Sequence, residues 1–187
     1  MGITFDAGQT WSSFEQFRDR ASTPRQAQIL QTVIDHSRAE VGGDLDGIMV
    51  TLVDEPRFHD HGVYPGVVED TGPKGRRAVV DNYQAMVDNG SYVIESRKER
   101  VIIDDDRLVT EGSFRQILTA PVARAMGFVN TDATGFFLVH ARTVVFWEFD
   151  QAGKAHGEDR YVFVQSVEPL AKEDLPDNYP QRLLAAG

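Results

Sequence analysis

The sequence predicts an α+β domain in which N-terminal helices wrap a cone-shaped, strongly curved mixed or antiparallel β-sheet around an apolar pocket. Helical patterns fill the first half of the 187-residue chain, and four long strand-like runs dominate the second half. The turn segments 104–106 and 150–153 join successive runs as hairpins. Large apolar residues alternate along the run 135–150, which indicates a strand with one buried face.

The composition is that of a soluble globular protein whose partners are neither nucleic acids nor membranes. A net charge of −10 and a pI near 4.9 oppose binding to polyanions. The absence of cysteine excludes disulfides, thiolate catalysis and cysteine-ligated metals. No apolar run reaches the length of a membrane span, and the N-terminus lacks the pattern of a secretory signal. We therefore expect a cytoplasmic protein.

Residues 1–23 are predicted to form an N-terminal extension to the main domain. Trp11, Phe14 and Phe17 recur at near-helical spacing in this stretch. The spacing indicates a short helix that lies on the domain as a packing arm or a subunit contact.

The main domain, residues 24–167, begins with a helix that runs to about Val41. Thr23 is a suitable N-cap, Pro24 suits the first helical position, and glycines follow Val41. His36 lies three residues after the apolar Val33, so it falls on or beside the inward face of this helix.

A second helix is predicted from Leu45 to about Val53, with Asp44 as its cap and Pro56 preventing continuation. The segment 57–61 follows as a strand. Its alternation places Phe58 and Asp60 on one face, and His59 and His61 on the other.

The remaining elements are a Gly- and Pro-rich loop at 63–75, a third helix at 75–89 with Tyr83 inward, and the meander. A partly helical excursion at 120–134 interrupts that meander, and residues 168–187 form a C-terminal tail. The four strand-like runs of the meander are 91–104, 107–119, 135–150 and 155–167.

Three ionisable residues, His59, Asp60 and His61, stand in a row in the predicted strand. An aspartate that enters an apolar cavity is a candidate acid/base group, and alternation directs Asp60 inward. The spacing of His59 and His61 also suits two metal ligands, with His140, Glu111 or Glu95 as a third. Surface or interface histidines are the alternative interpretation of that pair.

Three segments resemble the nuclear transport factor 2-like superfamily, which includes SnoaL-like polyketide cyclases and ketosteroid isomerases. They are the "GDLDGI" segment at 43–48 with the turn at 53–55, "GRRAV" at 75–79, and "FWEFDQAGK" at 146–154. With the order of elements, the resemblance covers roughly residues 24–166. It implies the cone fold, an apolar pocket and a homodimer.

The resemblance also implies roles for individual residues. Asp60 falls at the position of the isomerases' catalytic base, and His36 falls where those enzymes place a tyrosine that stabilises an oxyanion. Tyr83 matches a tyrosine that supports this network. Val145 stands where the isomerases have a second oxyanion donor, so steroid isomerisation itself is not expected.

These observations suggest a cofactor-independent acid/base lyase or isomerase, of the elimination, dehydration or deformylation type. The expected substrate is small, apolar and aromatic, such as a lignin-derived or polyketide-like compound. No cofactor and no metal are expected, and the predicted catalytic residues are Asp60, His36 and Tyr83. The predicted substrate pocket comprises Phe58, Val145, Trp147, His59 and His140.

Two alternatives remain open at this point. One is a non-catalytic domain that binds a small molecule or dimerises. The other is a metal-dependent enzyme that uses His59 and His61.

Overall fold

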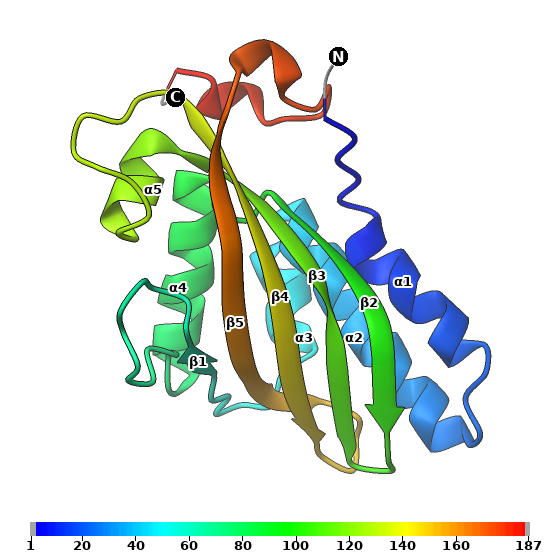
Figure 1. Ribbon diagram of the computed structural model, residues 1–187. Helices are drawn as coiled ribbons and strands as arrows, with labels where there is room; N and C mark the ends of the chain where they lie inside the picture. Colours follow the sequence, from blue (N-terminus) through cyan, green and yellow to red (C-terminus); the bar gives the residue numbers. More distant parts are fainter. Residues whose placement is uncertain (1–2, 186–187) are drawn as a thin grey trace.

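In a computed structural model that describes residues 3–185, a single five-stranded sheet carries helices on one of its faces (Figure 1). The strand order is β1-β5-β4-β3-β2. The strands are β1 (His59–His61), β2 (Ile94–Ile103), β3 (Arg107–Thr119), β4 (Phe136–Phe149) and β5 (Ala155–Leu170). The helices are α1 (Gln9–Arg18), α2 (Pro24–Gly42), α3 (Leu45–Val50), α4 (Arg76–Asn89) and α5 (Ala120–Ala125), with short 3-10 turns at Lys172–Asp174 and Gln181–Leu183.

The predicted fold class is confirmed: the sheet is mixed, curved and open. Strands β2 to β5 form an antiparallel meander, as the two hairpin turns indicated. The short strand β1 adds to the outer edge of β5 in parallel, with Asp60 directly opposite Arg160. This pairing joins two segments that lie 100 residues apart.

Helix α2 begins and ends where its capping residues predict. The Thr23 side chain accepts a hydrogen bond from the Gln26 backbone N–H, and Gly43 closes the helix at a φ of 65°. Helix α1 packs on α2 and on the edge strand β2. Its Thr10 and Ser13 hydroxyls accept hydrogen bonds from backbone N–H groups of β2, so this sheet edge is not left open.

Helix α3 is shorter than predicted, ending at Val50 rather than near Val53. The reason is tertiary: Leu52 forms an isolated parallel bridge with Ala155 at the start of β5, and Val53 donates its backbone N–H to the carbonyl of Ala155. Pairing with a distant strand replaces the last helical turn.

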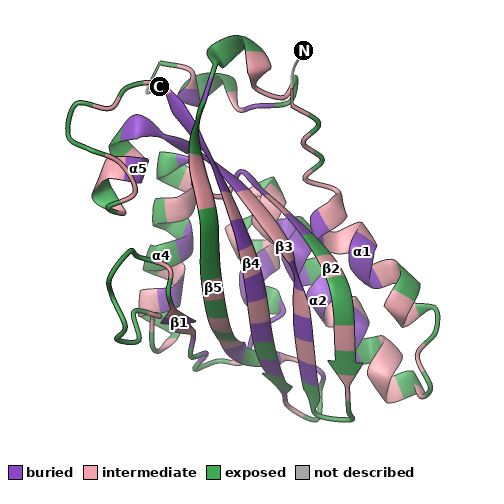
Figure 2. Cartoon of the chain, viewed as in Figure 1, coloured by how far each residue is buried: buried purple, intermediate pink, exposed green. Residues whose placement is uncertain are grey.

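Strand β4 lies at the centre of the sheet and carries the predicted apolar row. Phe137, Val139, Ala141, Val145, Trp147 and Phe149 are all buried. In Figure 2, buried and more exposed residues alternate along much of β4. Because helices α2, α3 and α4 cover this face, part of the row forms the main core and part remains available to line a cavity.

The C-terminal residues pack on one end of the domain instead of leaving it. Tyr179 and Leu183 are buried against Phe136 and Leu138 of β4. Within residues 3–185, no helix combines the length and apolar character that a membrane crossing requires.

Candidate functional site

A cavity of about 470 Å³ lies between the inner face of the sheet and helices α4 and α5. This volume is in the range of small-molecule sites. Apolar side chains form most of its walls, and polar side chains lie among them. Its large side chains are Tyr64, Met86, Phe114, Met126, Phe128, Val139, Val162 and Val164, and its polar ones include Asp60, Asn82, Asn89, Gln116, Thr143 and Arg160.

Asp60 and Arg160 are the charged residues of this cavity wall. They are cross-strand neighbours on β1 and β5, and Arg160 donates from Nε to Oδ1 of Asp60 at 2.8 Å. Both side chains are mostly buried, with exposed fractions of 11% and 26%. Burial alone would lower the pKa of Arg160, but Asp60 and Glu158 raise it above its ordinary value. The guanidinium is therefore a permanent cation at the cavity.

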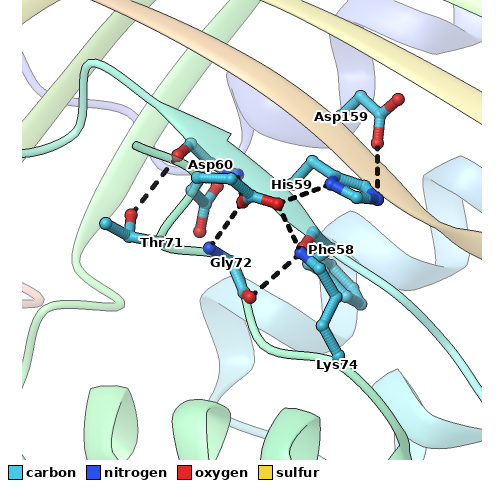
Figure 3. A network of polar contacts seen from close by, with 8 residues as sticks. Phe58, His59, Asp60, Thr71, Gly72, Lys74 and Asp159 are labelled. Atoms are coloured by element: carbon cyan, nitrogen blue, oxygen red, sulfur yellow. Dashed lines mark hydrogen bonds and ion pairs between the residues drawn. The ribbon is translucent and has the colours of Figure 1, made fainter. Parts of the chain in front are cut away.

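A second network holds Asp60 from the backbone side (Figure 3). The Asp70 carboxylate, from the loop between β1 and α4, accepts hydrogen bonds from the backbone N–H groups of Asp60 and Gly72 at 3.0 and 2.9 Å. It also contacts His59 Nδ1 at 2.6 Å and Lys74 Nζ at 2.8 Å.

Although burial opposes ionisation of Asp70, the bonds from Lys74, Gly72, Asp60 and His59 hold its pKa below its usual range. Asp70 thereby ties the loop at 63–75 to strand β1. The same loop brings Val63, Tyr64 and Thr71 to the cavity.

His36 lies on the inward face of α2, as its spacing predicted, and is 1% exposed. The Thr51 hydroxyl donates to the Ile48 carbonyl, so it can only accept at its 2.8 Å contact with His36 Nδ1. The proton of the imidazole is therefore on Nδ1, and Nε2 accepts from the Tyr83 hydroxyl at 3.0 Å. Burial lowers the pKa of His36 to about 4, and burial with nearby carboxylates raises the pKa of Tyr83 well above 10. Both groups are neutral at physiological pH.

The structure thus brings His36 and Tyr83 together, whereas Asp60 pairs with Arg160. Among residues 3–185, no hydrogen bond joins His36 to Asp60. Glu158 comes closer to the imidazole, with Oε1 3.7 Å from Nε2.

A smaller chamber of about 40 Å³ adjoins the main cavity. Phe114, Thr143 and Arg160 line both spaces, so they form the partition between them. The other polar residues that line the chamber are Thr10, Ser37, Glu40, Ser96, Lys98 and Glu158.

Burial shifts the ionisable groups of this chamber. It raises the pKa of Glu158 to about 8, and the Glu40 carboxylate contributes in the same direction. It also raises the pKa of Glu40 and lowers that of Lys98, although the opposite charges of the cluster oppose both changes. We call Asp60, Glu40, Glu158, Lys98 and Arg160 the charged cluster.

The five predicted pocket residues occupy different places. Val145 and Trp147 line the small chamber, and Phe58 packs edge-on against Tyr83 with ring centroids 5.9 Å apart. His59 lies on the outer side of β1, in a surface groove of mixed polar and apolar lining. His140 is half-buried on β4, where it pairs with Arg115 and Ser166.

The two histidines of β1 have protein partners of their own. His59 contacts Asp70 and lies 3.8 Å from Asp159, while His61 stacks on Tyr161 with centroids 4.8 Å apart. In the part of the chain from residue 3 to residue 185, no three His, Asp or Glu side chains are grouped as a metal site would require.

Sequence reasoning missed Arg160, Glu158, Glu40 and Lys98. Two local signals were present: Glu40 follows His36 by four residues on the same helical face, and Glu158 and Arg160 alternate on one face of β5. The sequence does not show which element packs against each of these faces, because alternation within one strand does not identify the strand or helix opposite it.

Several solved structures share this fold at low sequence identity. A protein named as a SnoaL-like polyketide cyclase from Jannaschia sp. CCS1 superposes with a TM-score of 0.57 at 14% identity, over 76% of this chain and 90% of that one. An NTF2-like protein from Anabaena variabilis superposes with a TM-score of 0.53 at 11% identity, over 78% of this chain and 93% of that one. TerC, co-crystallised with polyporic acid, superposes with a TM-score of 0.50 at 13% identity, over 72% of this chain and 90% of that one.

The resemblance to the nuclear transport factor 2-like superfamily is therefore confirmed at the level of the fold. Comparison of the sequence with protein-family models and with curated proteins finds no match.

Proposed function

We propose that this protein is a cofactor-independent acid/base enzyme, a lyase or isomerase, acting on a small and mainly apolar aromatic molecule. The observation that carries the proposal is the Asp60–Arg160 pair on the wall of an otherwise largely apolar cavity of about 470 Å³. A carboxylate and a fixed cation side by side can take a proton from carbon and stabilise the resulting anion.

Asp60 is the proposed base. Its Oδ1 accepts from Arg160 and its backbone N–H is held by Asp70, so the side chain has a defined orientation. In the described part of the chain, Oδ2 makes no hydrogen bond to another residue and is available to a substrate. A general base needs this combination of fixed geometry and one free oxygen.

Arg160 is the proposed oxyanion donor. It lies directly opposite Val145 across β4 and β5, and Val145 is the position where the isomerases carry a donor. Within residues 3–185, its Nη groups form no hydrogen bond to the protein. The donor missing from β4 can therefore be supplied by the adjacent strand, and such a donor is typically worth about 10²–10³ in rate.

His36 and Tyr83 are assigned a positioning role. The two imidazole nitrogens are occupied by Thr51 and Tyr83, so His36 has no donor left for a substrate. Its ring packs edge-on against Trp147 at 5.3 Å and supports the inner wall of the site.

The cavity walls support an aromatic substrate. Phe114, Phe128 and Tyr64 offer ring contacts, and Met86 and Met126 adapt to irregular shapes. TerC, which has a similar fold, was co-crystallised with polyporic acid. At fold level, this favours a small organic ligand over a macromolecular one.

The base can be tested without knowing the natural substrate, using 5-nitrobenzisoxazole as a probe. Proton removal from its ring carbon breaks the ring N–O bond, and the single product carries both a nitrile and a coloured nitrophenolate. We expect saturable turnover by the wild-type protein and a loss of about 10²–10⁴-fold in Asp60→Asn. Asp159→Asn is the matched control, because Asp159 precedes Arg160 on β5 but is 52% exposed on the outer face.

The outcomes separate enzyme from binding module. Equal turnover by Asp60→Asn and wild type would remove Asp60 as the base. Tight binding of the probe with no turnover above that of free carboxylate in solution would favour a binding domain.

We further propose that the protein forms a homodimer through the outer face of the sheet. Tyr161 and Phe163 of β5 and Phe146 of β4 are 40%, 59% and 44% exposed there. Tyr161 contacts both His61 and Phe146, so these rings form one aromatic patch. Exposed aromatic groups of this kind are enriched in protein interfaces.

A further inference from the structure

The charged cluster contains more carboxyl groups than cations. Asp60, Glu40 and Glu158 contribute three carboxyls, and only Lys98 and Arg160 are cations. His36 adds no charge, because both its nitrogens are used in its neutral form. When three carboxyls share two cations in a buried site, one of them retains a proton.

The hydrogen bonds indicate which carboxyl this is. Arg160 is committed to Asp60, and Lys98 donates to the Ser96 hydroxyl at 2.7 Å. In the described residues, neither the Glu158 carboxyl nor the Glu40 carboxyl accepts a hydrogen bond, and Glu158 is only 12% exposed. Glu158 also has Oε1 3.7 Å from His36 Nε2, which has no proton to donate because it accepts from the Tyr83 hydroxyl. A buried carboxylate that lacks donors and faces the lone pair of a neutral imidazole is unfavourable, so Glu158 is the member best suited to be neutral. Burial raises the pKa of Glu158 to about 8 and raises that of Glu40 as well, so the assignment rests on the contact with His36.

The chamber places Glu158 close to the wall of the main cavity. Its volume of about 40 Å³ exceeds the space that a buried water requires, and hydroxyl groups line it. Thr143 and Arg160 are the polar residues that line both the chamber and the main cavity, so a proton transferred between the two spaces passes these residues.

We propose that Glu158 is the proton store of the site: it holds a proton at neutral pH and passes it, through water in the chamber, to the leaving oxygen of a substrate in the main cavity. This inference rests on the proposed acid/base function. In an elimination, the C–H bond breaks, its proton goes to Asp60, and its electron pair forms the new double bond. The bond to the leaving oxygen breaks with its electrons, and that oxygen takes the proton from Glu158. The site is restored when the proton on Asp60 returns to Glu158 through solvent.

The groups that face Glu158 come from every element around it. They are His36 and Glu40 on α2, Asp60 on β1, Tyr83 on α4, Lys98 on β2 and Arg160 on β5. Two of them give sign-specific tests that leave Glu158 in place. Removing the negative charge in Glu40→Gln should move the Glu158 titration to lower pH, and removing the positive charge in Lys98→Met should move it to higher pH.

The first experiment needs no substrate. Infrared difference spectra of wild-type protein should show the carbonyl stretch of a buried, protonated carboxyl that disappears as pH rises through about 8. The band should be absent in Glu158→Gln. It should disappear at lower pH in Glu40→Gln and at higher pH in Lys98→Met than in the wild type. A band that persists in Glu158→Gln, or none in wild type at pH 6, overturns the assignment.

The second experiment compares two probes that differ only in the leaving group. The phenolate from 5-nitrobenzisoxazole leaves without a proton, whereas that from unsubstituted benzisoxazole benefits from one. Glu158→Gln should slow the unsubstituted probe at least about tenfold more than the nitro probe. Equal slowing of both refutes proton delivery. If instead Asp60→Asn turns over both probes like wild type, the proposed function fails while the infrared assignment of Glu158 stands or falls on its own.

Discussion

Protonation of the buried His36 imidazole should lower the free energy of unfolding of this protein in acid. The imidazole is buried and held neutral between Thr51 and Tyr83, and its pKa falls from an ordinary 6.5 to about 4. In the unfolded chain it takes up a proton at higher pH than in the folded protein. Its contribution to stability is therefore fully present above pH 6.5 and is lost as pH falls through about 4.

The magnitude follows from the shift. The pKa moves by about 2.5, and each unit corresponds to about 1.36 kcal/mol, so the full contribution is about 3 kcal/mol. Glu158 acts in the opposite direction, because its raised pKa stabilises the fold below about 4.5 and that contribution is lost as pH rises through about 8. Between pH 4.5 and 6.5 the two effects oppose each other, so the wild-type pH profile alone does not isolate His36.

A variant of His36 isolates its contribution to the free energy of unfolding. We would measure the free energy of unfolding by urea titration for wild type and His36→Asn at intervals from pH 7.5 to 4. The variant loses packing at every pH, but the difference between the two proteins should shrink by about 3 kcal/mol towards pH 4, since only wild type protonates His36 on unfolding. His156→Asn, at an exposed position, is the control and should show a constant difference.

A difference between wild type and His36→Asn that stays constant across this pH range would refute the reasoning. The imidazole would then not be held neutral by burial, and the Nδ1–H tautomer assigned from Thr51 would lose its support.

Three further predictions concern the supports of the site and its outer face. Asp70→Asn should destabilise the protein by about 1–2 kcal/mol and make the 63–75 loop more sensitive to protease, because the charge-assisted bonds to Lys74 and His59 are lost. Unchanged cleavage would mean that the loop is held by other contacts. Gly157→Ala should cost at least about 3 kcal/mol in urea unfolding, since φ is 138° and a Cβ would lie 1.8 Å from the Arg57 carbonyl oxygen. Phe163→Glu should shift the protein to monomers in sedimentation measurements while changing protomer stability by no more than about 0.5 kcal/mol, because Phe163 is exposed. Unaltered sedimentation would place the contact elsewhere.

Local sequence determined most of the secondary structure. Capping by Thr23, the left-handed glycines at Gly43 and Gly153, and the period of two along β4 each depend on a few adjacent residues. Such signals can be interpreted without knowing the tertiary structure. The end of α3 was one exception, since the bridge between Leu52 and Ala155 is a contact between distant segments.

Local periodicity also determined which side chains enter the site. Helical spacing turned His36 inward, and alternation turned Asp60 inward and left His59 half-exposed outside. A face is a property of one helix or one strand, so its sequence is sufficient to predict it.

Only the tertiary structure decided what those side chains meet. Parallel pairing of β1 with β5 gave Asp60 its partner, Arg160. The packing of the helices on the inner face of the sheet brought Glu40 of α2, Lys98 of β2 and Glu158 of β5 around one chamber. The neighbours of an inward face are set by strand order and helix packing, which join segments up to 100 residues apart. A periodic pattern fixes the direction of a side chain, but its charge environment depends on the elements that pack opposite it.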